Sequence, residues 1–438
     1  MEKPKFKEAL KFWFKLGFIS FGGPAGQIAL MHEHLVDKKK WISNSKFLHA
    51  LNYCMLLPGP EAQQLATYLG WLLHGRLGGL AAGLLFILPS MVILLALSIV
   101  YVNFGEVPWV YAIFDALKPA VVAIVLLALI KIARRSLSSY LHYFVALAAF
   151  VGIYFLEIRF PLIILGAIVL AAVLRYLWPA LFLAAQNHNQ SATDDENAYY
   201  INKNRLLPDI GFKPARFWKT IASSALLWIV PMAMFYLLAT DFAFWVKLST
   251  FFTQAAFVTF GGAYAVLPYV AQVSVEQFGW LTELQMIDGL ALGETTPGPL
   301  IMVLAFVGYM AGYNQFGSSL LMGSVALVAT TFYTFLPSFM FIFAGAPIIE
   351  KTQHNTKIKD VFSVVTAAVV GVILNLTIFF GQAVLFPQGF SLANINFIAL
   401  GWLAVSLIFL HRFKINIILW IALSALFGLL MHLAGVAY

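Results

Sequence analysis

The residues best suited to chemistry in this sequence gather around two copies of one tripeptide. Pro-Gly-Pro at residues 58–60 returns at residues 297–299, each time within a largely apolar stretch. Proline lacks the amide hydrogen that a helix interior needs, and glycine tolerates backbone conformations that other residues avoid. We therefore expect each tripeptide to end one helix and begin another. The start of a helix presents unpaired amide hydrogens and a positive dipole end, which favours an anion.

Polar side chains and glycines near these tripeptides form the candidate substrate site. Hydroxyls and amides can donate hydrogen bonds to an oxyanion without a fixed positive charge, which suits a site that must also release its ligand. A carboxylate in an apolar segment indicates function by default, although Glu61 could simply cap the helix that follows it. The candidate substrate-binding residues are Gly22, Gly23, Gln27, Asn52, Pro58, Gly59, Pro60, Glu61, Gln63, Gln64, Gly261, Gly262, Glu294, Thr295, Thr296, Pro297, Gly298 and Pro299.

The points at which the Pro-Gly-Pro and Phe-Gly-Gly motifs interrupt a helix are called the breaks below. Four charged residues outside the breaks are candidates for gating or coupling. Asp115 and Lys118 lie three positions apart, so they could form an ion pair along a helix, and that pair could be purely structural. His74 and Arg76 could act as a gate or could simply belong to an interfacial loop. The two histidines at residues 32–34 would point to different faces of a helix, and the spacing of zinc proteases is absent. We expect neither a metal nor a cofactor.

The composition places the chain in a membrane. Of its 438 residues, 61% are hydrophobic and only 11% are charged, whereas soluble domains carry about a quarter charged residues. Apolar runs such as residues 81–102 and 361–380 reach the roughly 20 residues that span the bilayer core. Lysines and arginines lie in short loops, which is typical of membrane orientation rather than of nucleic-acid binding. We expect no removable signal peptide, and the single Cys54 excludes an intramolecular disulfide.

A repeat divides the chain into two related parts. The sequence Phe-Ile-Ser-Phe-Gly-Gly at residues 18–23 returns in similar form at residues 257–262, at the same spacing as the Pro-Gly-Pro pair. Landmarks at one fixed spacing indicate internal duplication, which is common in transporters. We predict an N-terminal repeat (1–185), a polar cytoplasmic linker (186–219) and a C-terminal repeat (220–438), with an extra linking span at about 220–240.

The charges of one loop indicate that the two repeats have opposite orientations. Residues 37–46 carry one acid and four lysines, hence +3, whereas their counterparts at 276–285 carry two glutamates, hence −2. Lysine-rich loops stay in the cytoplasm, so the two loops should lie on opposite sides of the membrane. We predict an all-α polytopic membrane protein with two homologous halves in inverted topology.

The pieces on either side of each Phe-Gly-Gly and Pro-Gly-Pro motif are too short to cross the membrane alone. We favour re-entrant hairpins there over full spans, which leaves about nine spanning segments and places the basic loops on one side.

Two stretches of the first half closely resemble the chromate ion transporter (CHR) family. They are residues 21–29, with the sequence Phe-Gly-Gly-Pro-Ala-Gly-Gln-Ile-Ala, and residues 47–64, which contain the first Pro-Gly-Pro. The resemblance returns at residues 257–299 and covers nearly the whole chain. It implies a long-chain, two-domain inner (plasma) membrane protein that exports chromate and confers chromate resistance. The second half departs from the first at residues 263–266, where Ala-Tyr-Ala-Val replaces the Pro-Ala-Gly-Gln of residues 24–27. The resemblance therefore implies no glutamine in the second half with the role of Gln27.

Together with the resemblance, these observations favour a secondary transporter that exports chromate, with sulfate as the chemically similar anion it could also carry, driven by the membrane potential or by anion or proton exchange. No nucleotide-binding GxxxxGK[ST] loop occurs, and no protease or hydrolase motif suggests an enzyme. A transporter whose physiological substrate is sulfate or another oxyanion remains an alternative, as does a passive anion channel. The expected partners are the small oxyanion and the lipid bilayer, without nucleic acid, and a homodimer is compatible with the sequence.

Overall fold

A computed structural model describes residues 3–21, 23–178, 198–202, 213–349 and 356–435, which are mostly helical. The helices of the first half and the linking helix are α1 (Phe6–Ile19), α2 (Gly23–His32), η1 (Glu33–Lys38), α3 (Asn44–Cys54), α4 (Glu61–Phe104), α5 (Pro108–Ser136), α6 (Tyr140–Tyr154), α7 (Phe160–Leu177) and α8 (Pro214–Leu238). Those of the second half are α9 (Phe242–Phe257), α10 (Ala263–Ala271), η4 (Gln272–Gln277), α11 (Glu283–Thr295), η5 (Leu300–Met302), α12 (Val303–Gln315), α13 (Leu320–Ile349), α14 (Thr356–Leu385), η6 (Leu392–Asn394), α15 (Phe397–His411) and α16 (Ile417–Leu433).

Local signals in the sequence explain where many of these helices begin and end. Thr282 and Gln285 form a reciprocal capping box at the start of α11, and the Asp241 side chain caps α9. Helix α4 is bent where His74 and Gly75 leave the helical conformation, and Gly75 has a φ of 67° that suits glycine. The bend divides α4 into a short arm (61–73) and a long arm (76–104).

The broken helices of the first half form hairpins that open on one side of the molecule. Lys39, just after η1, pairs with Glu8 of α1 at 2.7 Å. His74, at the end of the short arm of α4, donates a hydrogen bond of 2.8 Å from Nε2 to the carbonyl of Pro4. Both hairpins, α1–α2 and α3–α4, therefore start and end beside the N-terminus. We call this side the N-terminal face.

The equivalent hairpins of the second half open on the other side, which we call the opposite face. Gln315, at the end of α12, donates to Asp241 at the start of α9, and Asn314 donates to the carbonyl of Trp280. Helix α8 joins the two faces, because Arg76 contacts Thr220 near its start and Asp241 follows its end. Its 25 residues extend about 37 Å, enough to cross a bilayer core. The predictions of inverted halves and of re-entrant breaks are confirmed.

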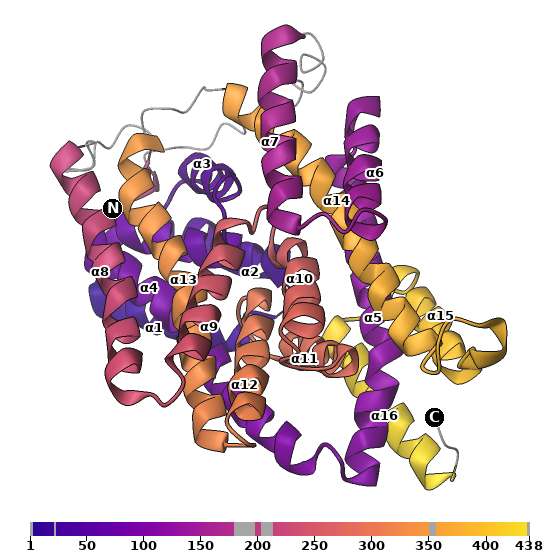
Figure 1. The fold of residues 1–438 in the computed structure, drawn as a ribbon. Helices are drawn as coiled ribbons and strands as arrows, with labels where there is room; N and C mark the ends of the chain where they lie inside the picture. Colours follow the sequence, from indigo (N-terminus) through magenta and orange to yellow (C-terminus); the bar gives the residue numbers. More distant parts are fainter. Residues whose placement is uncertain (1–2, 22, 179–197, 203–212, 350–355, 436–438) are drawn as a thin grey trace.

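The long helices enclose these hairpins and intertwine the two halves. Helix α14 of the second half packs against α6 and α7 of the first, and α5 packs against α15 and α16. Figure 1 shows α9 to α12 in the middle of the molecule, with α8 and α13 on one side and α5 and α14 on the other. Six of the described helices, α4, α5, α7, α8, α13 and α14, are long and apolar enough to cross a membrane. Helices α6, α15 and α16 are apolar but shorter, with 15 to 17 residues each.

One described piece of the linker lies on the N-terminal face. Ile201 pairs in parallel with Ile42, and its backbone carbonyl accepts from the amide of Ser43 at 2.8 Å. This contact places the linker beside the basic loop at residues 37–46. Residues 186–197 and 203–212 of the expected linker lie outside the described residues.

Candidate substrate site at the paired helix breaks

The tips of the hairpins from the two faces meet in the interior, where each half completes the backbone of the other. The amide of Gly59 donates to the carbonyl of Thr259 at 2.7 Å, and the amide of Gly298 donates to the carbonyl of Ser20 at 2.8 Å. Each Pro-Gly-Pro is thus hydrogen-bonded to the segment before the Phe-Gly-Gly of the other half. Backbone groups freed by a helix break inside a membrane must find such partners or face a watery cavity.

The two central glycines could not be replaced by larger residues without strain. Gly59 has a φ of 125° and Gly298 a φ of 106°, conformations that residues with a side chain rarely adopt. A methyl group on Gly59 would lie 2.6 Å from Nε2 of Gln64, and one on Gly298 would collide with Ser90. The breaks therefore require glycine for both backbone conformation and space.

Two serines at equivalent positions of the two halves pack against the Pro-Gly-Pro breaks. Ser90, in the long arm of α4, donates to the carbonyl of Pro297. Its counterpart Ser338, in α13, lies against Gly59, but its hydroxyl has no partner among the described residues. Both serines are buried. Each serine ends a Leu-Pro-Ser tripeptide, at residues 88–90 and 336–338, but this repeat alone does not show that the serines contact the helix breaks.

Three buried glutamines converge on the breaks. Gln27 donates from Nε2 to the carbonyl of Gly298 at 2.6 Å, and Gln64 donates to the carbonyl of Pro58 at 2.7 Å. Gln63 donates to the hydroxyl of its helix neighbour Thr67. The side-chain oxygens of all three glutamines have no partner among the described residues. Gln27 uses both amide hydrogens on backbone carbonyls, those of Gly298 and Ser20, so its amide would have to rotate before it could donate to an anion.

The two predicted carboxylates have different surroundings. Glu61 is the first residue of α4 after Pro60 and is partly buried at the start of that helix. Glu294, near the end of α11, accepts a hydrogen bond from the hydroxyl of Tyr264. Thr295 and Thr296 both donate back to the carbonyl of Leu292, so their hydroxyl hydrogens are used within their own helix.

The other predicted residues lie at varying distances from this centre. Gly23, Gly261 and Gly262 have positive φ angles at the starts of α2 and α10, where no methyl clash accounts for glycine at Gly23 or Gly262. Asn52 is exposed on α3. Gly22 lies outside the described residues.

A buried polar cluster joins α4, α5 and α11 away from the breaks. Lys118 pairs with Asp115 at 2.9 Å, as the spacing predicts, and both are largely buried. Lys118 also interacts electrostatically with Asp288 of α11, which accepts a hydrogen bond of 2.9 Å from the hydroxyl of Tyr101. The second carboxylate oxygen of Asp288 has no partner among the described residues. Two acids therefore share one lysine.

Asp288 was missed as a candidate in the sequence. It lies in the apolar run Met-Ile-Asp-Gly-Leu at residues 286–290, so the reasoning that singled out Glu294 applies to it equally.

A cavity of about 700 Å³ with both apolar and polar lining residues lies on the opposite face, between α7, α9 and η4. Two cations, Arg159 and Lys247, line it together with the amides of Gln254, Gln272 and Gln277. Such a lining attracts anions and offers them hydrogen bonds. Sequence reasoning missed this cavity because its residues come from separate segments that carry no shared pattern.

Comparison with known proteins decides the family. The model of the chromate transporter family matches residues 7–172 and 246–429, one region in each half. The chain belongs to the chromate transporter family. It is 30% identical to a chromate transport protein of Pseudomonas aeruginosa over 424 residues, which cover 96% of this chain and 91% of that protein.

Two further relatives show how widely the similarity extends. A probable chromate transport protein of Synechococcus elongatus is 29% identical over 86% of this chain and 84% of its own length. An uncharacterized transporter of Methanocaldococcus jannaschii is 27% identical over 98% and 96%. No solved structure matches the chain. Like the family, the chain is a multi-pass protein of the cell membrane.

Proposed function

We propose that this protein is a secondary transporter that exports chromate from the cytoplasm, and that sulfate competes with chromate for the same site. The observation that carries the proposal is the meeting of hairpin tips from opposite faces, with the breaks of each half bonded to the other half. In transporters built from inverted repeats, substrates bind at such broken helices near the bilayer midplane. Helix starts at Pro60 and Pro299 supply the positive dipole ends that an oxyanion needs.

The distribution of charge supports an orientation of the protein in the membrane. Lysines and arginines concentrate on the N-terminal face, in residues 3–7, 37–46 and 131–135, so we assign this face to the cytoplasm. The cationic cavity at Arg159 and Lys247 then lies on the external face, where it would receive the anion as it leaves the breaks. Binding is coupled to rotation of the Gln27 amide, which turns its donors from the backbone carbonyls of Gly298 and Ser20 toward the anion.

The energy comes from the membrane potential. Each charge is worth about 2.3 kcal/mol per 100 mV, so a dianion leaving a negative interior gains about 4.6 kcal/mol. This energy supports a concentration ratio of more than roughly a thousandfold without ATP. A proton carried on Glu61 or Glu294 is the second candidate source, because an ionised carboxylate beside the anion would repel it.

Flux into proteoliposomes tests the proposal directly. Chromate flux should saturate, fall when sulfate is added, and accelerate when chromate is present on the far side. Molybdate in the same competition would show how strictly the site selects among oxyanions. Linear flux without acceleration from the far side would indicate a channel, and no flux of any of the three anions would contradict oxyanion transport.

A further inference from the structure

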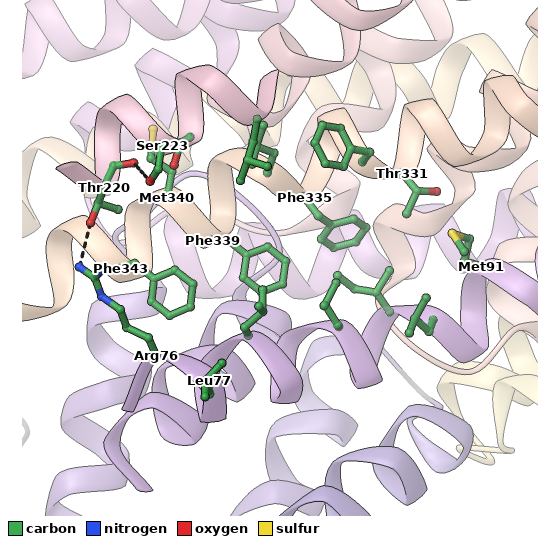
Figure 2. Close-up of a pocket in the computed structure, with 18 of the residues that line it drawn as sticks. Arg76, Leu77, Met91, Thr220, Ser223, Thr331, Phe335, Phe339, Met340 and Phe343 are labelled. Carbon is green, nitrogen blue, oxygen red and sulfur yellow. Dashed lines mark hydrogen bonds between the residues drawn. The ribbon is translucent and has the colours of Figure 1, made fainter. Parts of the chain in front are cut away.

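An apolar groove of about 560 Å³ runs between the long arm of α4, α8 and α13. Figure 2 shows phenylalanines 335, 339 and 343 of α13 facing the side chains of α4 along its length. Several of its lining residues, including Leu84 and Val328, are also exposed on the outer surface of the molecule. The groove therefore opens sideways, toward the lipid that surrounds a membrane protein.

One end of the groove is cationic and the other is not. Arg76 lies at the end on the N-terminal face, where its guanidinium donates to the hydroxyl of Thr220 at 3.2 Å (Figure 2). Ser223 lies beside Thr220, and no described carboxylate forms an ion pair with Arg76. At the far end, Met91 and Thr331 close the groove without any charge. The arrangement is that of a charged head position followed by an apolar channel.

The length of the groove matches one leaflet of a bilayer. Arg76 and Met91 are separated by fifteen residues of α4, or about 22 Å of helix. Half of a bilayer, including its headgroup region, measures about 20–22 Å. Arg76 lies at the membrane surface by this measure and Met91 near the midplane. The apolar body of the groove excludes it as a route for a dianion, because a charge would be desolvated there without a partner.

We propose that this groove binds one anionic phospholipid from the leaflet at the N-terminal face. Its phosphate lies on Arg76, beside Thr220 and Ser223, and an acyl chain fills the space between the leucines of α4 and the phenylalanines of α13. Ile87, Leu88 and Met91 of α4 and Leu336 of α13 line the groove, and they lie within three residues of Ser90 or Ser338 along their helices.

Native mass spectrometry of the purified full chain tests this assignment. Phosphatidylglycerol and phosphatidylcholine with identical acyl chains are added in turn to protein in mild detergent. We expect one phosphatidylglycerol to bind in preference to phosphatidylcholine. Arg76→Gln should lower the phosphatidylglycerol affinity about fivefold, the effect of one cation at the membrane surface, and leave phosphatidylcholine binding unchanged.

Two further variants separate the groove from general surface charge. Arg134→Gln removes an exposed arginine from the end of α5 on the same face, outside the groove, and should leave phosphatidylglycerol affinity unchanged. Leu84→Trp narrows the groove and should reduce occupancy by both lipids. Equal binding of the two lipids, or equal effects of Arg76→Gln and Arg134→Gln, would overturn the proposal. A second copy of the chain in place of lipid, seen as a dimer that Leu84→Trp dissociates, would overturn it too.

Discussion

At the scale of single residues, the two central glycines explain why the breaks take the shape they have. Gly59 and Gly298 combine a positive φ with a space too small for a methyl group. Both donate the hydrogen bonds that cross between the halves. A change at either position therefore moves a backbone amide on which the other half depends.

Replacing either glycine should damage transport more than folding. We expect Gly59→Ala and Gly298→Ala to lower the initial rate of chromate flux about tenfold, because each forces about 1–3 kcal/mol of backbone strain into the break. Gly166→Ala in α7 and Gly401→Ala in α15 are matched controls, since both are helical and nothing lies near the added methyl group. Flux at the wild-type rate in both break variants, at equal reconstituted protein, would argue against a site there.

The lysine shared by two acids makes a prediction about stability. Lys118→Met leaves Asp115 and Asp288 without a cation and should cost about 3–5 kcal/mol, the usual penalty for an uncompensated buried charge. The double variant Lys118→Met with Asp115→Asn should recover part of this loss. Thermal unfolding in detergent measures both, with exposed Lys131→Met as the control. Unfolding of Lys118→Met at the wild-type temperature would show that the cluster carries little net stabilisation.

At the scale of secondary structure elements, the re-entrant hairpins decide which loops share a face. Two contacts tie the hairpins of the first half to the N-terminus, through Glu8 and Pro4. Two others tie the hairpins of the second half to the start of α9 and to Trp280. Loops that occupy the same position in the repeat thus emerge on opposite faces.

Cysteine labelling in intact cells tests this arrangement. With Cys54 replaced, single cysteines are placed at Lys39 and Gln277, both of which are exposed. An impermeant thiol reagent should label the Gln277 position and leave the Lys39 position unlabelled until the cells are opened. Labelling of both positions, or of Lys39 alone, is incompatible with halves of opposite orientation.

The sequence predicted the position of the breaks well, because proline and glycine act on the backbone where they stand. It also located the ion pair of Asp115 and Lys118, whose helical spacing is a local property. The partners that the breaks find in the other half could not be predicted, since Ser20 and Gly298 are far apart in the chain and only the packing of the two halves joins them. For the same reason Asp288 and the cavity at Arg159 and Lys247 stayed hidden.

At the scale of the whole molecule, the charge on the substrate sets the direction of spontaneous movement. In proteoliposomes at equal pH, a potassium diffusion potential set with valinomycin should drive chromate toward the positive side. Reversing the potassium gradient should reverse the flux, and equal potassium with valinomycin serves as the control. Flux that ignored the potential and followed only a pH gradient would instead favour a titrating carboxylate, with Glu294→Gln as the variant to test next.

The backbone hydrogen bonds between the two halves also bear on how the protein is synthesised and inserted. The amide of Gly59 finds its partner at Thr259, about 200 residues further along the chain. At the usual speed of ribosomes, about 5–20 residues per second, the first hairpins wait roughly 10–40 s before that partner is synthesised. If the hairpins entered the membrane during this interval, their broken ends would carry unpaired backbone groups, which hydrocarbon does not tolerate. The first half must therefore remain at the membrane surface, or beside the insertion machinery, until the second half arrives to complete it.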